Sequence, residues 1–438
     1  MKAKPILTTI FFFLTTTFCY SQFNDYWPQW RGPLGTGAAV KGNPPIEFSE
    51  TKNLKWKTEI PGFGNATPIV WEDKIIVQTA VATDQKGSVE NEEGGGGWMN
   101  PTSTEFVHDF EVLCVDRNNG KINWETTVTS ELPLENTHEL GSWASNSPVT
   151  DGEKIYAYFG SRGLYCLDFD GKVLWKRDFG QMEKRASFGE GASPFVYKDR
   201  IFIQWDHEGD SYLFCLDKNS GEEIWKVSRD EKTTWSTPVV VEAGGKTQVI
   251  ASATKAISSY DFENGELIWS STGMTENVIP IPMVADGILY AMSGFRGSAL
   301  QAIDLSKASG DIKGTDAIVW EYNQDTPYTP CGVLMNDKIY FLRVNNGALT
   351  CLNAKDGTPY YSKERVEGIS TLFSSPTGAA NQLYIAAENI CTVVKAGEQF
   401  GILSTNELDD NFHASPVIVG DQLILRGFKS LYCFEEMD

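Results

Sequence analysis

The stretch that decides the fold runs from residue 147 to residue 175 and reads SPVTDGEKIYAYFGSRGLYCLDFDGKVLW. It holds four short apolar segments, which are separated by turn residues at Asp151-Gly152, Gly160 to Gly163, and Asp170-Gly171. Short β-branched and aromatic segments that alternate with Gly and Asp turns are typical of antiparallel strands joined by hairpins. The stretch therefore predicts one four-stranded antiparallel sheet.

The same pattern recurs along the chain. Each unit opens at an X-Pro dipeptide, often Ser-Pro or Thr-Pro, and successive prolines lie 80, 46, 44, 44, 48, 46 and 40 residues apart. The one long step contains a Gly- and Glu-rich insertion, which we place at residues 81–105 as a loop with Trp98. Repeats of this length with four strands each are typical of a β-propeller, in which every unit forms one blade. The unit-opening prolines are Pro68, Pro148, Pro194, Pro238, Pro282, Pro330, Pro376 and Pro416.

The two ends of the repeat region determine the number of blades. The last unit stops after its third strand at Leu431 to Phe434, whereas residues 53–56 form a fourth strand that precedes the first proline. Pairing these two segments closes the ring and leaves no open sheet edge where the chain ends meet. We therefore predict an all-β, eight-bladed β-propeller at residues 53–438 with four-stranded blades and N-terminal strand closure. A lead segment at residues 22–52 precedes it.

Tryptophans and cysteines recur in register within these units. A Trp closes the fourth strand of most units, Tyr360 takes its place in the sixth, and we expect these rings to dock one blade on the next. The cysteines of different blades occupy equivalent positions, which should be farther apart than the ~7 Å that a disulfide permits, so we expect free, buried thiols. The tryptophans are Trp56, Trp124, Trp175, Trp225, Trp269 and Trp320, and the cysteines are Cys114, Cys166, Cys215, Cys351 and Cys433.

The N-terminus and the net charge bear on location and partners. Residues 1–21 read as a secretory signal peptide, with Lys2 and Lys4 before an apolar run from Ile6 to Phe18, so we predict export to the periplasm or secretion. No later apolar run approaches the ~18 residues of a membrane-spanning segment. The net charge of −21 disfavours nucleic acid as a partner, because the long-range field repels polyanions.

In a propeller, the loops between strands two and three and between strand four and the next blade emerge on one face around the axis, which we call the axial face. Cations in the first set of loops would favour an anionic ligand such as an acidic or sulfated sugar. The alternative is that they are solvated residues with acidic neighbours. Aromatic side chains in the second set would stack on a ligand ring or fill the axial channel. The cations are Arg162, Lys255, Arg296, Arg343 and Lys429, and the aromatic residues are Trp143, Trp235 and Tyr328.

The repeat, with its Asp, its Thr/Asn-Gly turn and its closing Trp, resembles the blade of the pyrroloquinoline-quinone (PQQ) dehydrogenase superfamily. The segment WPQWRGP at residues 27–33 likewise resembles the lead segment of secreted PQQ-binding-like propellers. The resemblance implies that PQQ with calcium is the ligand of the axial face. Glu190, Asn277 and Asn146 have the right chemistry for the metal, and Asn277 joins the cations as a cofactor-binding candidate. The adjacent Cys-Cys pair of the PQQ alcohol dehydrogenases is missing from this sequence.

Three functions follow from these features. The first is an alcohol or sugar oxidoreductase in which Glu190 or Asp325 acts as the base. The second is a non-catalytic propeller that binds an envelope protein or a polysaccharide. The third is a polysaccharide lyase in which His413 or Tyr328 is the base and Arg343 neutralises a uronate. The sequence contains no zinc, haem, P-loop or dinucleotide motif that would point to another chemistry.

Overall fold

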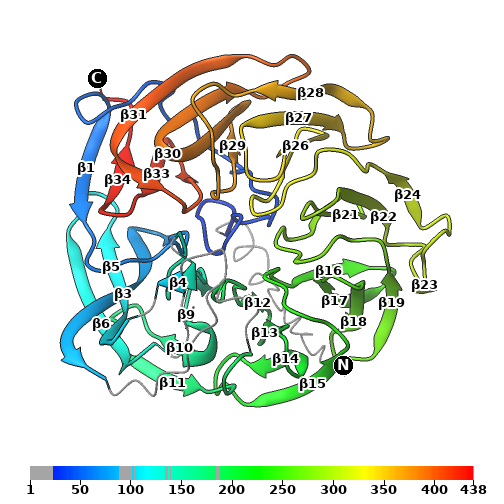
Figure 1. The fold of residues 1–438 in the computed structure, drawn as a ribbon, viewed down its shortest axis with the longest axis horizontal. Helices are drawn as coiled ribbons and strands as arrows, with labels where there is room; N and C mark the ends of the chain where they lie inside the picture. Colours follow the sequence, from blue (N-terminus) through cyan, green and yellow to red (C-terminus); the bar gives the residue numbers. More distant parts are fainter. Residues whose placement is uncertain are drawn as a thin grey trace, which may run out of the picture.

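The computed structural model describes residues 23–87, 101–102, 104–133, 137–138, 140–183 and 188–437. Within these ranges the strands form eight blade sheets and one small two-stranded sheet. The blades lie around a central axis, as Figure 1 shows. The prediction of an all-β, eight-bladed propeller is confirmed. Residues 1–21, with the predicted signal peptide, and Trp98 lie outside the described residues.

Five blades use four strands in sequence order, from the axis outwards. Blade 1 contains β2 (Ile69–Trp71), β3 (Lys74–Lys86), β5 (Phe106–Asp116) and β6 (Ile122–Glu131). Blade 2 contains β8 (Val149–Thr150), β9 (Ile155–Tyr158), β10 (Leu164–Leu167) and β11 (Val173–Arg177). Blade 3 contains β12 (Phe195–Tyr197), β13 (Arg200–Trp205), β14 (Ser211–Asp217) and β15 (Glu223–Arg229). Blade 5 contains β20 (Met283–Ala285), β21 (Ile288–Ser293), β22 (Ala299–Asp304) and β24 (Ile318–Glu321), and blade 6 contains β25 (Val333–Met335), β26 (Lys338–Leu342), β27 (Ala348–Asn353) and β28 (Pro359–Arg365).

Blades 4 and 7 vary this plan. Blade 4 contains β16 (Val239–Ala243), β17 (Lys246–Ser252), β18 (Ile257–Asp261) and β19 (Leu267–Ser271), and β23 (Gly310–Asp311) joins β19 as a parallel fifth strand. Blade 7 contains β29 (Thr377–Ala379), β30 (Gln382–Lys395) and β31 (Ile402–Phe412). Strand β30 reverses its direction at Glu388, whose φ is +49°. The Ala396 amide therefore donates to Asn381 O at 2.8 Å, which joins the two ends of β30. The two halves of β30 thus serve as strands two and three of blade 7.

The N-terminal closure is confirmed in blade 8. Strand β1 (Leu54–Glu59) pairs with β34 (Ser430–Phe434), followed inwards by β33 (Gln422–Arg426) and β32 (Val417–Val419). In this register Trp56 lies opposite Cys433. The ring therefore closes through hydrogen bonds between the two ends of the repeat region.

The closing tryptophans dock on a glycine of the next blade. A Cβ atom added to Gly120 would lie 2.7 Å from the Trp56 ring, whose Nε1 donates to Arg117 O at 2.8 Å. The same contact recurs in four further pairs, so the sequence pairs a flat ring with a glycine turn that leaves room for it. These pairs are Trp124 with Gly171, Trp175 with Gly221, Trp225 with Gly265, and Trp320 with Gly357.

Two predictions about these positions were wrong in detail. Trp269 does not dock in the same way: it is fully buried and donates from Nε1 to Gln248 Oε1 of its own blade at 3.0 Å. In blade 6 the register places Tyr361 opposite Cys351, so Tyr361 and not Tyr360 takes the tryptophan position. The cysteines behave as predicted, because all seven in the described ranges are free and buried.

The residue before each unit-opening proline forms a hydrogen-bonded ring around the axis. The Ser147 amide donates to Ser193 Oγ at 2.9 Å, and the Ser193 amide donates in turn to Thr237 Oγ1 at 2.9 Å. Each such bond joins the innermost strand of one blade to that of the next, which explains the recurrent Ser-Pro and Thr-Pro dipeptides. The other links are Ile281 to Cys331 Sγ, Cys331 to Ser375, Ser375 to Ser415, Ser415 to Thr67, and Thr67 to Ser147.

Blade 6 corrects the predicted repeat. Val333 pairs with Tyr340 as Met283 pairs with Tyr290 in blade 5, so Gly332 and not Pro330 is equivalent to the unit-opening proline. The residue before it, Cys331, supplies sulfur where other blades supply a hydroxyl. The ring is interrupted after Thr237, because the apolar Ile281 side chain has no acceptor to offer.

We expect Ser193→Ala to lower the free energy of unfolding by about 1–3 kcal/mol, because it leaves the buried Ser147 amide without an acceptor. Ser193→Thr should retain the wild-type stability, since Thr67 and Thr237 hold equivalent positions. Urea unfolding measures both variants. Equal stability of the alanine and threonine variants would show that the ring contributes nothing measurable.

The lead segment crosses the end of the propeller that holds the turns between strands one and two, and it appears dark blue near the centre of Figure 1. Trp27 is fully buried and exchanges two backbone hydrogen bonds with Val70 of blade 1. Arg31 is also buried, and its Nη2 donates to Gly332 O and to Pro376 O at 2.8 Å each. This segment thus ties blade 1 to blades 6 and 7.

The insertion loop was predicted at residues 81–105, but the structure shows that residues 81–86 still belong to strand β3. Val81 pairs with Asp109 and Lys86 pairs with Phe106, so strands β3 and β5 extend beyond the ordinary length of a blade strand. Farther along the chain, β4 (Pro101–Thr102) pairs with β7 (Thr137–His138) in a two-stranded sheet.

Candidate functional site

The antiparallel order of the blades places the loops between strands two and three on the same end as the loops that lead to the next blade. All five predicted cations lie on loops between strands two and three. Each has a carboxylate from a fourth strand or the following loop within 4.0 Å. The pairs are Arg162 with Glu131 and Glu190, Lys255 with Asp230, Arg296 with Glu276, Arg343 with Asp325, and Lys429 with Asp409.

The four pairs other than that of Arg162 make the axial face a ring of ion pairs with exposed cations rather than a concentration of positive charge. The Lys255 Nζ lies 2.5 Å from Asp230 Oδ1, and the Lys429 Nζ lies 3.7 Å from Asp409 Oδ1. The Asp230 and Asp409 side chains are 95% and 89% exposed, so water screens both pairs. A free anion gains little from cations that already face carboxylates.

Arg162 differs from the other four cations because it is buried. Its guanidinium lies 4.9 Å from the centre of the Phe110 ring, its Nε lies 3.7 Å from Glu131 Oε1, and its Nη1 lies 4.0 Å from Glu190 Oε2. The Arg162 side chain is 1% exposed. It therefore belongs to the packing between blades 1 and 2 and does not reach the surface of the face.

Glu190 holds a turn of blade 2. Its carboxylate accepts hydrogen bonds from the Ser161 amide at 2.6 Å and from Ser161 Oγ, at the short helix η1 (Gly160–Arg162). A Cβ on Gly160, whose φ is +59°, would lie 1.5 Å from Glu190 Oε2, so only glycine fits there. The carboxylate that we considered as a base or a metal ligand is thus engaged in holding the η1 turn.

Two further carboxylates have the same task, and the sequence analysis missed both. Glu231 accepts from the Lys255 and Ala256 amides at 2.9 and 3.0 Å, and burial raises the pKa of Glu231. Asp410 accepts from the Lys429 and Ser430 amides at 3.1 and 3.0 Å. An acidic residue at or just after the end of a fourth strand is the signal that would have found them.

Asp325, the other carboxylate considered as a base, lies between two cations. Its Oδ1 is 3.1 Å from Arg343 Nε, and its Oδ2 is 3.2 Å from Lys363 Nζ. Asp325 adopts a φ of +54°, in the left-handed region. Each of its two carboxylate oxygens thus faces a cation.

His413 lies in an aromatic cage. Its ring centre is 4.7 Å from the centres of both Phe373 and Phe428, and its Nδ1 lies 3.2 Å from Leu140 O. Burial lowers the pKa of His413 to about 4, so the imidazole is neutral at neutral pH. With that pKa, it is a weak base.

The remaining candidate residues pack within the face. Tyr328 lies against Phe295 at 4.7 Å, Trp143 lies against His108 at 4.7 Å, and Trp235 donates from Nε1 to Gly189 O at 2.9 Å. Tyr328 thus packs against Phe295, whereas His413 packs against Phe373 and Phe428, so the two bases considered for a lyase have different aromatic neighbours. The two asparagines are buried: the Asn146 side chain donates to Ala192 O at 2.6 Å, and the backbone N–H of Asn277 donates to Thr254 Oγ1 at 3.0 Å.

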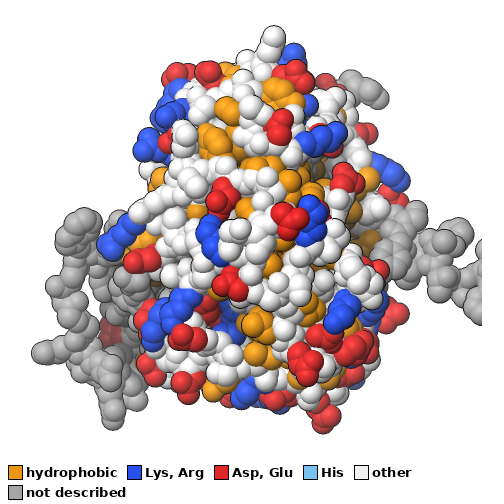
Figure 2. All heavy atoms as spheres, turned by 90° about the vertical axis from the view of Figure 1, so that its right-hand side faces the viewer, with side chains coloured by type: hydrophobic (Ala, Val, Ile, Leu, Met, Phe, Trp, Pro, Cys, Tyr) orange, Lys and Arg blue, Asp and Glu red, His pale blue; other side chains and the backbone are white. Residues whose placement is uncertain are grey.

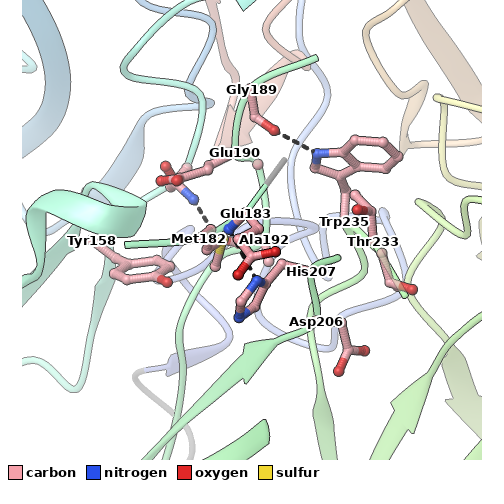
Figure 3. Close-up of a pocket in the computed structure, with 13 residues that line it drawn as sticks. Tyr158, Met182, Glu183, Gly189, Glu190, Ala192, Asp206, His207, Thr233 and Trp235 are labelled. Atoms are coloured by element: carbon pink, nitrogen blue, oxygen red, sulfur yellow. Dashed lines mark hydrogen bonds between the residues drawn. The ribbon is translucent and has the colours of Figure 1, made fainter. Parts of the chain in front are cut away.

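A cavity of about 20 Å³ lies among blades 2, 3 and 4 on this face, and Figure 3 shows its lining. The Tyr158 hydroxyl is buried and has no hydrogen-bond partner among the residues that the structure describes. His207 Nδ1 accepts from the Glu183 amide at 3.0 Å, and Asp206 is held by Arg229 at 2.8 Å. A space of this size accommodates one water molecule.

The residues of this face do not fit PQQ with calcium. The described ranges contain no group of three or more acidic, His or Cys side chains that would hold a metal ion. The cavity of about 20 Å³ is far smaller than a three-ring tricarboxylate. The cations that would bind its carboxylates already face Asp and Glu side chains. We therefore derive no chemical step through this cofactor.

Eight blades with N-terminal closure, five of whose junctions hold a tryptophan against a glycine turn, define the chain as a PQQ-binding-like β-propeller. Residues 108–213 and 209–426 match the family model described as outer membrane protein assembly factor BamB. Because these matches cover more than half of the chain, the chain belongs to this family.

Known proteins share the fold at low identity. The chain is 21% identical over 233 residues to the tetrathionate hydrolase of Acidithiobacillus ferrooxidans, which covers 49% of this chain and 41% of that protein. Among solved structures, BamB from Moraxella catarrhalis aligns with a TM-score of 0.58 and 12% identity over 87% of this chain and 99% of the other. A europium-containing methanol dehydrogenase aligns with a TM-score of 0.65 and 11% identity over 93% and 90%. At these identities the likeness shows the fold alone.

No helix in the described part of the chain is long and apolar enough to cross a membrane.

Proposed function

We propose that the chain is an exported scaffold of the cell envelope that binds a protein partner across its axial face. The observation that carries the proposal is the ring of ion pairs, because alternating exposed charges suit the polar rim of a protein interface better than a site for one small anion. Arg296 is 70% exposed and Lys429 is 65% exposed, so these side chains are available for contact. The family description, an outer membrane protein assembly factor, supports the same reading.

The carboxylates support a scaffold over an enzyme. Glu190, Glu231 and Asp410 accept amide hydrogen bonds of the turns, so each is held by the fold itself. Asp325 faces two cations. A general base needs an oxygen within hydrogen-bond reach of its substrate proton, and these carboxylates already use their oxygens within the protein.

Site-specific photo-crosslinking tests the proposal. A photoreactive phenylalanine analogue placed at Lys255 or Arg296 should give a covalent adduct of one defined mass in cells that express the chain. The matched control is Leu174, which is 43% exposed on the outer strand β11 and should give no such adduct. The protein should also fail to retain PQQ after incubation with PQQ and calcium. Retained quinone together with the absence of adducts would overturn the proposal in favour of an oxidoreductase.

A further inference from the structure

The end of the propeller opposite the axial face contains a second hollow. It has a volume of about 670 Å³ and lies between the lead segment and blades 5 and 6, where its lining reaches from the inner strands β20 and β25 out to β24. This volume falls within the ~300–1,000 Å³ that is usual for ligand pockets. Its lining is mainly apolar and comes from Leu34, Ala38, Ala39, Val40, Val284, Ala285, Ile288, Tyr290, Val319, Trp320, Leu334, Met335 and Ala354, with Thr36, Asp286, Asn336, Asp337 and Lys355 as the polar members.

The walls of this hollow are held in place by the fold. The Leu334 amide donates to Thr36 O at 2.9 Å, which joins the lead segment to blade 6. Trp320 donates from Nε1 to Ala354 O at 3.1 Å, and the Tyr290 hydroxyl donates to the same carbonyl at 3.0 Å. The hollow is thus formed before any ligand arrives, and a preformed site loses little conformational entropy on binding.

The apolar lining of the hollow is open to solvent. Leu34 is 56% exposed, Val319 is 49% exposed and Val40 is 44% exposed, although all three are aliphatic. Figure 2 views the side of the molecule that holds β23 and β24 and shows hydrophobic side chains between groups of charged ones. Apolar side chains that stay this exposed in a hollow are typical of an interaction site.

The rim of the hollow carries negative charge. Lys355 Nζ lies 3.1 Å from Asp337 Oδ2, so these two charges offset each other. Asp286 is exposed, its φ is +49°, and it has no hydrogen-bond or ion-pair partner in the described part of the chain. With a net charge of −21 for the whole chain, this rim favours a positively charged group.

We propose that this hollow binds a peptide segment of a partner protein in which a bulky apolar side chain lies next to a lysine or arginine. The apolar side chain would fill the space between Trp320 and the lead segment, and the basic group would meet Asp286. This site lies at the opposite end of the molecule from the ring of ion pairs. The test of this site is therefore independent of the test of the partner proposed for the axial face.

Peptide binding tests the inference. Fluorescence anisotropy would follow a fluorescein-labelled peptide of sequence Lys-Phe-Leu-Lys with blocked ends, beside the matched peptide Glu-Phe-Leu-Glu. We expect saturable binding of the basic peptide and at least about tenfold weaker binding of the acidic one, which corresponds to ~1.4 kcal/mol. Absence of saturable binding of the basic peptide, or equal binding of both peptides, would overturn the proposal.

Substitutions locate the binding. The double variant Leu34→Ser with Val319→Thr should weaken the affinity for the basic peptide by about tenfold, since it removes apolar area from the hollow. The matched control is Leu174→Ser with Ile224→Thr, because Leu174 and Ile224 also precede a docking tryptophan and are 43% and 42% exposed. Asp286→Asn should weaken the binding of the basic peptide and leave the binding of the acidic peptide unchanged. Equal losses in the first double variant and its control would contradict the assignment, and unchanged unfolding midpoints confirm that all variants remain folded.

Discussion

Gly120→Ala is expected to lower the free energy of unfolding by about 4 kcal/mol. About 1–2 kcal/mol of this arises because Gly120 has a φ of +75°, which an alanine adopts only with strain. The remainder arises because the new Cβ would lie 2.7 Å from both the Trp56 ring and Thr58 Oγ1, and overpacking of this kind costs ~1–3 kcal/mol. Trp56 lies on β1, so the displaced ring is the one that docks the closing strand of blade 8 on blade 1.

Gly245→Ala is the matched control. Gly245 has a φ of +72°, and no heavy atom of the described residues lies within 4 Å of an added Cβ, so its alanine variant should lose only the backbone part of about 1–2 kcal/mol. Urea unfolding of the two variants in parallel separates backbone strain from the clash with Trp56. If both glycines cost the same, the tryptophan contact at the closure contributes no packing energy, and closure rests on the hydrogen bonds between β1 and β34 alone.

The sequence was sufficient to predict the ring because strand formation and blade docking are local. A Gly-containing turn followed within a few residues by Trp is visible in one unit, and the same two residue types meet again between neighbouring blades, as Gly171 and Trp124 do. The closing role of residues 53–56 followed from counting strands. No long-range geometry was needed for either conclusion.

The irregular units could not be predicted in the same way. Pro330 has the spacing of a unit-opening proline, yet Gly332 holds the equivalent position in the structure. Only the pairing of Val333 with Tyr340 shows which of the two residues opens blade 6. Gly332 also receives Arg31 from the lead segment, a contact across 301 residues that no local pattern indicates. Trp269 occupies the repeat position in the sequence, but in the structure β23 pairs with its strand, β19. The sequence pattern does not indicate this fifth strand.

The candidate site was half predicted for a related reason. The cations were found because they recur on equivalent loops, but their carboxylates lie on other loops of neighbouring strands. Arg343 and Asp325, for example, are 18 positions apart and meet at 3.1 Å only when blades 5 and 6 are assembled. A count of charges along the chain therefore suggested an excess of positive charge that the folded face does not have.

The largest pH effect is expected at His413. Its pKa is lowered to about 4 by burial, whereas an unfolded histidine titrates near ~6.5. Between these two values the unfolded chain binds more protons than the folded one, so the contribution of His413 to stability is complete above pH 6.5 and is lost as the pH falls towards 4. A difference of this size corresponds to about 3 kcal/mol at ~1.36 kcal/mol per pH unit.

His413→Phe isolates this contribution, because a phenyl ring fits the cage between Phe373 and Phe428 and does not titrate. At pH 7 the variant should be slightly less stable than the wild type, since it lacks the contact of Nδ1 with Leu140 O. Near pH 4.5 it should be the more stable of the two, and the difference between their unfolding free energies should change sign on the way. Carboxylates that titrate in the same range contribute equally to both proteins and cancel in that difference. A pH-independent difference would mean that the imidazole charges within the cage without cost, and hence that water reaches His413 through the axial face.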